Sequence, residues 1–326
     1  MKKICYTLVM LLMASVTSFA ADDAKIILQH NGQAKIYDGS QLAEAINDAE
    51  EGKDTLYLSE GSFGELKLTK RLLVRGSGVN TVINGDIAIS ATGTCTTPIL
   101  EGLYTTGTVY VNSILDNMII KHVSMEHFSL NAKVSKATVR QCYIRNTLKL
   151  NAYCDSLSLI NTKIYYLDGA STANNKCNFL NCNIFQAYWE RVAGVFVNCI
   201  ISAWWSYEDR GGGSISNSLL SYSVYNSRFI SIAENSIQND CIPFYANNHI
   251  YIDGRSAYPI LNYIDCESLY APSEQKWFGS DNTEIGIYGG NKPYTLVPAV
   301  PRITDKTITV DSKNNKLKVS FSVTAQ

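Results

Sequence analysis

The chain has 326 residues, of which 46% are hydrophobic and only 17% are charged, so one or two domains can bury a large core. The net charge is −1 and no block of basic residues occurs, which argues against nucleic acid as a partner. The 20 tyrosines favour β structure, because aromatic side chains suit a pleated surface.

The first twenty residues have the pattern of an export signal. Lys2 and Lys3 precede a short apolar run over residues 7–16, and residues 18–20 (Ser-Phe-Ala) form a small-x-small cleavage pattern. The apolar run is too short to cross a bilayer, so we expect no transmembrane segment. Cleavage after Ala20 predicts an extracytoplasmic protein that resides in the periplasm, on the outer cell surface or in the medium, and we expect it to be a monomer.

Residues 40–50 have the apolar spacing of an amphipathic helix. Leu42, Ala45, Ile46 and Ala49 follow the i, i+3, i+4, i+7 pattern, with Ser40 as a capping residue and Gly52 as a stop. Short strand patterns separated by glycine-containing turns follow at residues 55–58, 65–68, 71–74, 81–83 and 86–89.

A repeat of the form Asn-small-x-apolar begins near residue 116 and decides the fold. Its members are Asn161–Ile164, Asn181–Ile184, Asn198–Ile201 and Asn217–Leu220, and His122–Met125 and Gln141–Ile144 share the pattern with a different first residue. The spacing varies between 17 and 20 residues, and a repeat of this period predicts a solenoid.

The variable spacing selects the kind of solenoid. A leucine-rich repeat needs a regular leucine lattice, and a left-handed β-helix needs sides of six residues, whereas a right-handed parallel β-helix tolerates turns of different length. Equivalent positions then stack about 4.8 Å apart. We expect the asparagines to form a column at a turn, with their amides hydrogen-bonded along the axis.

The residues from Leu42 to Ile83, including Asp54–Gly61 and Leu72–Gly78, resemble the opening of pectin-lyase-like β-helix proteins, in which a short helix plugs the first coil. The segment Glu284–Gly290 resembles the closing segment of exported β-helix proteins of the Bacteroidetes. The resemblance implies an all-β fold: a right-handed parallel β-helix with an N-terminal capping α-helix and a small C-terminal β extension.

These patterns divide the chain into four parts. Residues 1–20 are the signal peptide, 21–54 an N-terminal strand and capping helix, 55–275 the β-helix, and 276–326 a C-terminal β cap or attachment segment. In the last part, residues 307–310 and 316–323 alternate apolar and polar side chains, which predicts a hairpin around Asn314 and Asn315.

Eight cysteines follow the signal peptide, and an exported protein can oxidise them to disulfides. Several of them stand at repeat positions that Ser or Thr occupy in other coils. We therefore expect small buried side chains in preference to bridges. No His or Cys spacing suits zinc and the acidic residues near the last coils are too sparse for calcium, so we expect no metal and no cofactor.

The resemblance suggests lyases or hydrolases of acidic polysaccharides, but their motifs do not occur in the coils. The Asp-Asp, Gly-His-Gly and Arg-Ile-Lys elements of polygalacturonases are missing, as is the Arg-x-Pro-x-x-Arg arrangement of pectate lyases, and the only Asp-Asp pair is Asp22-Asp23. Whether the protein is an enzyme stays open, and the sequence favours a non-catalytic protein that binds polysaccharide or has a structural role at the cell surface.

Three arginines, Arg191, Arg210 and Arg228, follow one another at intervals close to one coil. Arginine forks grip carboxylates or sulfates and aromatic rings stack on sugars. We therefore predict a glycan-binding face made of these arginines with Tyr188, Trp189, Trp204, Trp205 and Tyr225. The alternative is a surface network of ion pairs with the neighbouring acids.

A lyase on this face would need a base and a group that holds the uronate carboxylate. Tyr207 or Tyr222 can supply the base, and Arg191 or Arg210 can hold the carboxylate. A hydrolase would need two carboxylates instead, for which Glu190 and Asp209 are the best pair.

Overall fold

The structure is a computed structural model that describes residues 24–96, 98–150, 154, 156–168, 176–188, 193–205, 213–216, 218–220, 224–225, 231–232, 237–238, 279, 281–296, 302–311 and 316–324. For residues 176, 188, 193, 202–205, 213–216, 219–238 and 302–324, only the backbone is described. The predicted sites at residues 189–192, 207–210, 222 and 228 lie outside the described residues.

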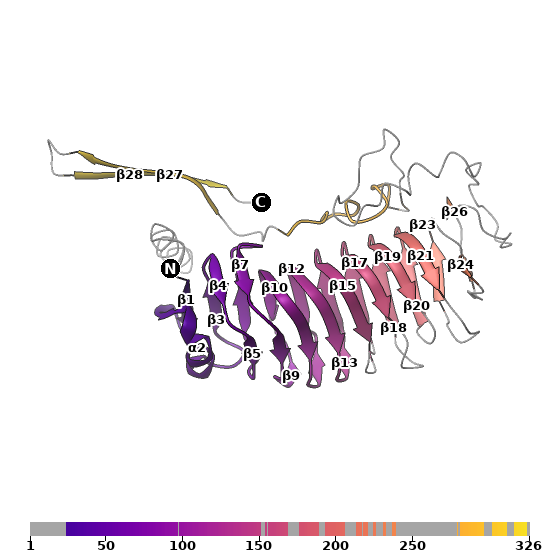
Figure 1. Cartoon of the computed structure of the whole chain (residues 1–326), viewed down its shortest axis with the longest axis horizontal. Helices are drawn as coiled ribbons and strands as arrows, with labels where there is room; N and C mark the ends of the chain where they lie inside the picture. The colour runs from indigo at the N-terminus through magenta and orange to yellow at the C-terminus, as the bar shows by residue number, and fades with distance from the viewer. Residues whose placement is uncertain are drawn as a thin grey trace.

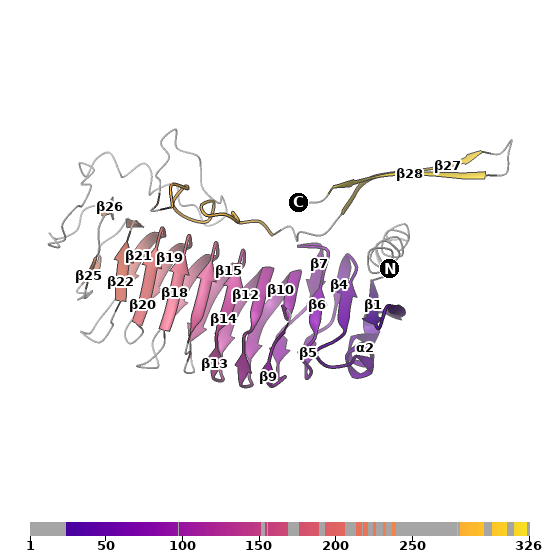
Figure 2. The same ribbon diagram turned by 180° about the vertical axis from the view of Figure 1, so that it is seen from behind.

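The fold is a parallel β-solenoid, in which each coil contributes strands to three long sheet faces (Figures 1 and 2). Two strands are long enough to pass through all three faces, β10 (Leu100–Val111) and β12 (Ile119–Leu130). The predicted fold class, an all-β parallel β-helix with one short N-terminal helix, is confirmed.

Face A contains the first strand of each coil, including the start of β10 and β12. The other strands are β3 (Thr55–Leu58), β6 (Leu73–Arg75), β14 (Ala137–Arg140), β16 (Leu157–Ile160), β18 (Lys176–Leu180), β20 (Ala193–Val197), β22 (Gly213–Ser216) and β25 (Ser231–Ile232), all paired in parallel.

Faces B and C follow face A along each coil. Face B has β4 (Gly61–Phe63), β7 (Thr81–Ile83), β23 (Leu219–Leu220) and β26 (Ile237–Gln238); face C has β5 (Leu66–Leu68), β8 (Ile87–Ile89) and β24 (Val224–Tyr225). Four strands bend from B into C: β15 (Tyr143–Leu150), β17 (Lys163–Asp168), β19 (Asn183–Tyr188) and β21 (Ile200–Trp205). A small fourth sheet joins β9 (Gly93–Thr94), β11 (Leu115–Asp116) and β13 (Val134–Ser135).

The N-terminal end of the solenoid is closed by a hairpin and a helix. Strands β1 (Lys25–His30) and β2 (Gln33–Asp38) pair with each other, and β1 pairs antiparallel with β3. The 3-10 turn η1 (Gly39–Gln41) leads into α2 (Leu42–Asp48), and the predicted apolar face of this helix packs into the core. The plug predicted from residues 40–50 is therefore confirmed.

The start of the helix differs from the prediction. Ser40 lies inside η1, and the backbone N–H of Asp38 donates to the side chain of Gln41 at 2.9 Å. The glycine-rich region before residue 65 was also predicted to be turn only, whereas Gly61 begins β4 with a φ of 125°. A glycine can enter a strand in this conformation without steric cost, so the glycine itself does not show where a strand ends.

The core fills the bore of the solenoid with columns of stacked apolar side chains. One column on face C runs through Val109, Phe128, Leu148, Leu167 and Ala187, and all five are fully buried. On face A the rings of Phe179 and Phe196 stack 4.4 Å apart.

The chain ends in the predicted two-stranded hairpin, β27 (Arg302–Asp311) paired antiparallel with β28 (Lys316–Thr324). Figures 1 and 2 place this hairpin beyond the N-terminal coils and away from the last ones.

Cys142, Cys182 and Cys199 occupy a buried column at the start of face B, and three further cysteines are buried elsewhere in the core. Cys95, Cys142, Cys154, Cys177, Cys182 and Cys199 are free and buried, so the prediction of small core side chains is confirmed for these six. The Cys142 thiol donates to the carbonyl of Arg140 at 3.2 Å, and Thr162 on the next coil donates to Ile160 at 3.0 Å. Cys241 and Cys266 lie outside the described residues.

We expect these thiols to resist alkylation in the folded protein. Burial raises the pKa of Cys142 to about 12, so at pH 8 only roughly one thiol in ten thousand is ionised. Iodoacetamide labelling followed by peptide mass spectrometry should find Cys142, Cys182 and Cys199 unmodified in the native chain and modified in urea. Rapid labelling of Cys142 under native conditions would contradict the buried column.

Candidate functional site

The repeated asparagines stand at a sharp turn between faces A and B. Asn161, Asn181 and Asn198 have φ values of 46°, 52° and 54°, and His122 and Gln141 share this left-handed conformation. The preceding coil has Gly102 at the same position. Asparagine tolerates the left-handed region better than most residues, which explains why the repeat favours it. We call these six residues the turn column.

In the turn column, the side chains of His122, Gln141 and Asn161 bind the C-terminal part of the chain. Residues 281–296, which we call the strap, run along the turn column from the last coils towards the first (Figures 1 and 2). The side-chain amide nitrogen of Asn161 donates two hydrogen bonds, to the carbonyls of Ile287 and Gly289, at 3.0 and 2.7 Å. The expected turn is confirmed, but hydrogen bonding between neighbouring amides is wrong for Asn161, because both of its donors bind the strap.

Further contacts extend the strap in both directions. The amide of Gln141 donates to the carbonyl of Pro293 at 2.7 Å, and His122 Nδ1 lies 2.8 Å from the carbonyl of Thr295. At the other end, the N–H of Gly286 donates to the carbonyl of Asn198 at 2.9 Å. The turn column is therefore a binding strip for an extended backbone.

Glycines let the strap approach the column closely. A Cβ atom on Gly290 would lie 2.5 Å from Nδ2 of Asn181, and one on Gly286 would lie 2.6 Å from Oδ1 of Asn183. The strap also buries Ile287 and Tyr294, which are 1% and 8% exposed. The glycines at residues 286 and 290 and the buried side chains of Ile287 and Tyr294 thus let the strap pack closely against the turn column.

The outward side of face B, next to the strap, carries a row of tyrosines and cations. Strand register places Tyr104, Ser124, Tyr143 and Lys163 at one position on successive coils. The small Ser124 leaves a gap between the two tyrosines, and Arg145 fills it. The Arg145 guanidinium carbon lies 5.0 Å from each tyrosine ring centroid, and Nε donates to Ser124 Oγ at 3.0 Å.

The same row continues with a second cation. Lys163 Nζ lies 4.6 Å from the ring centroid of Tyr143, so aromatic ring and cation alternate along the axis. We call Tyr104, Arg145, Tyr143 and Lys163 the tyrosine–cation row. Arg145 is exposed, and no described residue accepts a hydrogen bond from its Nη atoms. A guanidinium that is held between two rings and has free Nη atoms can take a bidentate acceptor from solution.

A second charged cluster lies on face A around a buried carboxylate. The carboxylate of Glu101, whose side chain is 2% exposed, accepts from Arg75 Nη2 at 2.7 Å and contacts Lys121 Nζ at 2.6 Å. Burial raises the pKa of Glu101, but the hydrogen bond with Lys121 and the charge of Arg75 outweigh it, so the pKa lies below its usual value. Both of its oxygens contact cations of this chain, so the cluster serves the fold.

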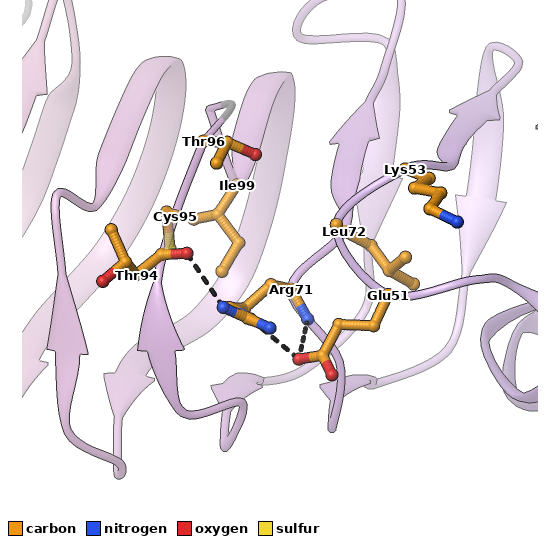
Figure 3. Close-up of a pocket in the computed structure, with 9 residues that line it drawn as sticks. Glu51, Lys53, Arg71, Leu72, Thr94, Cys95, Thr96 and Ile99 are labelled. Atoms are coloured by element: carbon orange, nitrogen blue, oxygen red, sulfur yellow. Dashed lines mark hydrogen bonds and ion pairs between the residues drawn. The ribbon is translucent and has the colours of Figure 1, made fainter.

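A cavity of about 240 Å³ opens beside the turn that follows α2 (Figure 3). Arg71 extends across it, donating from Nε to Glu51 at 2.9 Å and from Nη1 to the carbonyl of Thr94 at 3.0 Å. These partners neutralise the guanidinium, and the hydrogen bonds from Arg71 hold the pKa of Glu51 below its usual value. Cys95 faces the cavity, but burial raises its pKa and leaves the thiol protonated. The cavity offers no free charge for chemistry.

Some of the predicted glycan-binding residues have a described backbone, and the others lie outside the described residues. Register stacks Tyr188, Trp205 and Tyr225 at one position of face C on three successive coils. Trp204 continues the column whose earlier members, such as Leu167 and Ala187, are buried. Outside the described residues lie Arg191, Arg210, Arg228, Trp189, Tyr207, Tyr222, Glu190 and Asp209.

The tyrosine–cation row was not predicted from the sequence. Its signal is a Tyr, Ser, Tyr, Lys series at intervals of 19 or 20 residues, which becomes visible once the coils are aligned on the turn column. Arg145 lies two residues after this position and reaches back over the preceding coil. The sequence pattern predicted neither the position of the strap along the turn column nor the residues that bind it.

No protein-family model, curated protein or solved structure that we compared with the chain gives a match. The fold itself defines the class, a parallel β-helix protein. In the part of the chain that the structure describes, no helix has the length and apolar character needed to cross a membrane. Within the same residues, no three His, Cys, Asp or Glu side chains are grouped to hold a metal ion.

Proposed function

We propose that this is an exported, non-catalytic β-helix protein of the pectin-lyase-like type that binds acidic polysaccharide at the cell surface. The observation that carries the proposal is the Arg145 guanidinium held between Tyr104 and Tyr143 with its Nη atoms turned to no described acceptor. The export-signal pattern at residues 1–20 and the Bacteroidetes-like strap sequence support the location.

The chemistry of the row suits a uronate or a sulfated sugar. A planar guanidinium grips a carboxylate or sulfate through two parallel hydrogen bonds, and the flanking rings present apolar faces to the sugar. Lys163 adds a second positive charge one coil further on, while Glu126, which accepts from the Tyr104 hydroxyl at 3.4 Å, is the acid nearest to the row in the described contacts. The row therefore favours anionic ligands.

The β-helix geometry suits a polymer. Equivalent side chains repeat at every coil, about 4.8 Å apart, so a ligand chain along the axis meets several coils. The aromatic positions at Tyr188, Trp205 and Tyr225 on face C support an extension of the binding surface towards the last coils. Arg191, Arg210 and Arg228 remain part of this proposal.

Replacing Arg145 with Gln should weaken binding of polygalacturonate or alginate about 10- to 100-fold, because one charge-assisted fork is lost. Surface plasmon resonance with immobilised glycan measures the affinity. Arg71→Gln is the matched control, because it removes the same charge from a guanidinium already held by Glu51, and it should bind as the parent does. Equal affinity of the Arg145 variant and the parent would overturn the site. Release of unsaturated, ultraviolet-absorbing products would establish a lyase instead.

A further inference from the structure

The strap places a buried phenol beside the tyrosine–cation row. Tyr294 is 8% exposed and its hydroxyl has no hydrogen-bond partner among the described residues. Its neighbours on the strap and the coil are fixed, since Pro293 accepts from Gln141 and the Tyr294 N–H donates to Ile287 at 2.7 Å. A buried hydroxyl without a partner is unfavourable and calls for an explanation.

The surroundings of this hydroxyl identify the missing partner. The phenol lies close enough to Tyr143 and Arg145 to interact with them electrostatically. Burial raises the pKa of Tyr294, so the hydroxyl stays protonated and acts as a donor. On the next coil the ammonium of Lys163, which is 5% exposed, lies 4.6 Å from the ring centroid of Tyr143. Donors and positive charge thus gather at one place, and an anion is the acceptor that suits all of them.

We propose that the strap forms part of the anion site, so that a carboxylate or sulfate bound at Arg145 accepts the Tyr294 hydroxyl and fastens the strap to the coils. The inference rests on the proposed function only for the source of the anion, an acidic sugar. The strap would be held by backbone hydrogen bonds to the turn column in the free protein and gain one further bond in the complex.

Such an arrangement couples two events. A ligand that binds better when the strap is docked must, by linkage, favour the docked strap by the same factor. The hairpin β27–β28 follows the strap in the chain, so ligand binding on the coils would also hold the start of the C-terminal module in place. The coupling needs no rearrangement of the coils themselves.

Hydrogen–deuterium exchange of residues 281–296 tests the proposal on the full mature chain. Sodium sulfate and digalacturonate serve as probes, with sodium chloride at equal ionic strength as the reference. Saturating probe should slow exchange of the strap about 10- to 100-fold, the effect of one hydrogen bond to a charged acceptor. The N–H groups of Gly286 and Ile287, which donate to Asn198 and Asn183, report docking directly.

The decisive variant is Tyr294→Phe, which keeps the ring and deletes the hydroxyl. Without probe its strap should exchange as slowly as the parent strap or more slowly, because an unsatisfied group is gone, and probe should give no further protection. Tyr288→Phe alters the more exposed tyrosine of the same strap and should respond to probe as the parent does. Faster exchange of Tyr294→Phe without probe would mean that the hydroxyl already has a partner, and would overturn the proposal.

The outcomes separate this inference from the proposed function. Glycan binding that depends on Arg145 but leaves strap exchange equal in the parent and Tyr294→Phe would overturn the coupling and keep the function. Sulfate protection that depends on Tyr294, without any binding of polyuronate, would keep the anion site and overturn the function.

Discussion

Replacing Glu101 with Gln should lower the free energy of unfolding by about 3–5 kcal/mol, the usual result of removing one partner from a buried ion pair. Strand register places Arg75, Glu101 and Lys121 on three successive coils, and Arg140 follows on the next. Glu101 is the only acid in this series of four. Without its charge, Arg75 and Lys121 would face each other across a nearly dry site, where repulsion is poorly screened. Urea unfolding followed by circular dichroism measures the loss.

The pH dependence gives the same prediction a second readout. The pKa of Glu101 is lower in the fold than in the unfolded chain, where it takes its usual value near 4.5. Because the pKa is lower in the fold, the charged form stabilises the fold fully at pH values above the unfolded pKa. This contribution disappears as the pH falls through the lowered pKa of the folded state. The parent should therefore lose stability below about pH 4.5 more steeply than Glu101→Gln, which has already lost the contribution.

Glu51→Gln provides the comparison for Glu101→Gln. Glu51 also pairs with an arginine, Arg71 at 2.9 Å, but its side chain is 41% exposed. An exposed pair contributes only about 0–1 kcal/mol, so this variant should unfold almost as the parent does. Equal losses for the two variants would show that the Glu101 cluster behaves as a surface network.

The coil scaffold could be predicted because its repeat depends on local backbone conformation. Each turn needs one residue in the left-handed region, and Asn161, Asn181 and Asn198 meet that need with a residue type that stands out in the sequence. The buried position after each of them accepts Cys, Thr or Ser, so the free thiols could also be predicted. These features depend on one coil and its neighbour alone.

The strap and the tyrosine–cation row depend on contacts that the sequence does not mark. Asn161 and Gly289 are 128 residues apart, and the hydrogen bond uses a backbone carbonyl, which every residue has. Arg145 needs the gap above Ser124, 21 residues earlier, and the exact register is required to see it. The sequence interpretation instead emphasised arginines at equal intervals, and these lie outside the described residues.

Replacing Asn161 with Ala is the most informative change in the turn column. It removes both hydrogen bonds to the strap, at about 1 kcal/mol each. It also places a residue with a Cβ and no compensating polar group at a φ of 46°, which costs about 1–2 kcal/mol. We expect the free energy of unfolding to fall by about 3–4 kcal/mol in total. Strap exchange should accelerate in the same variant, because Ile287 and Gly289 lose their donors.

Asn161→Gly separates the two causes. Glycine adopts the left-handed conformation freely, so only the hydrogen bonds are lost and the expected destabilisation is about 2 kcal/mol. Strap exchange should be equally fast in both variants, because neither has an amide, while unfolding in urea should distinguish them. If Asn161→Gly were as stable as the parent and its strap exchanged as slowly, the turn column would be a conformational device only, and the strap would be held by its buried Ile287 and Tyr294 instead.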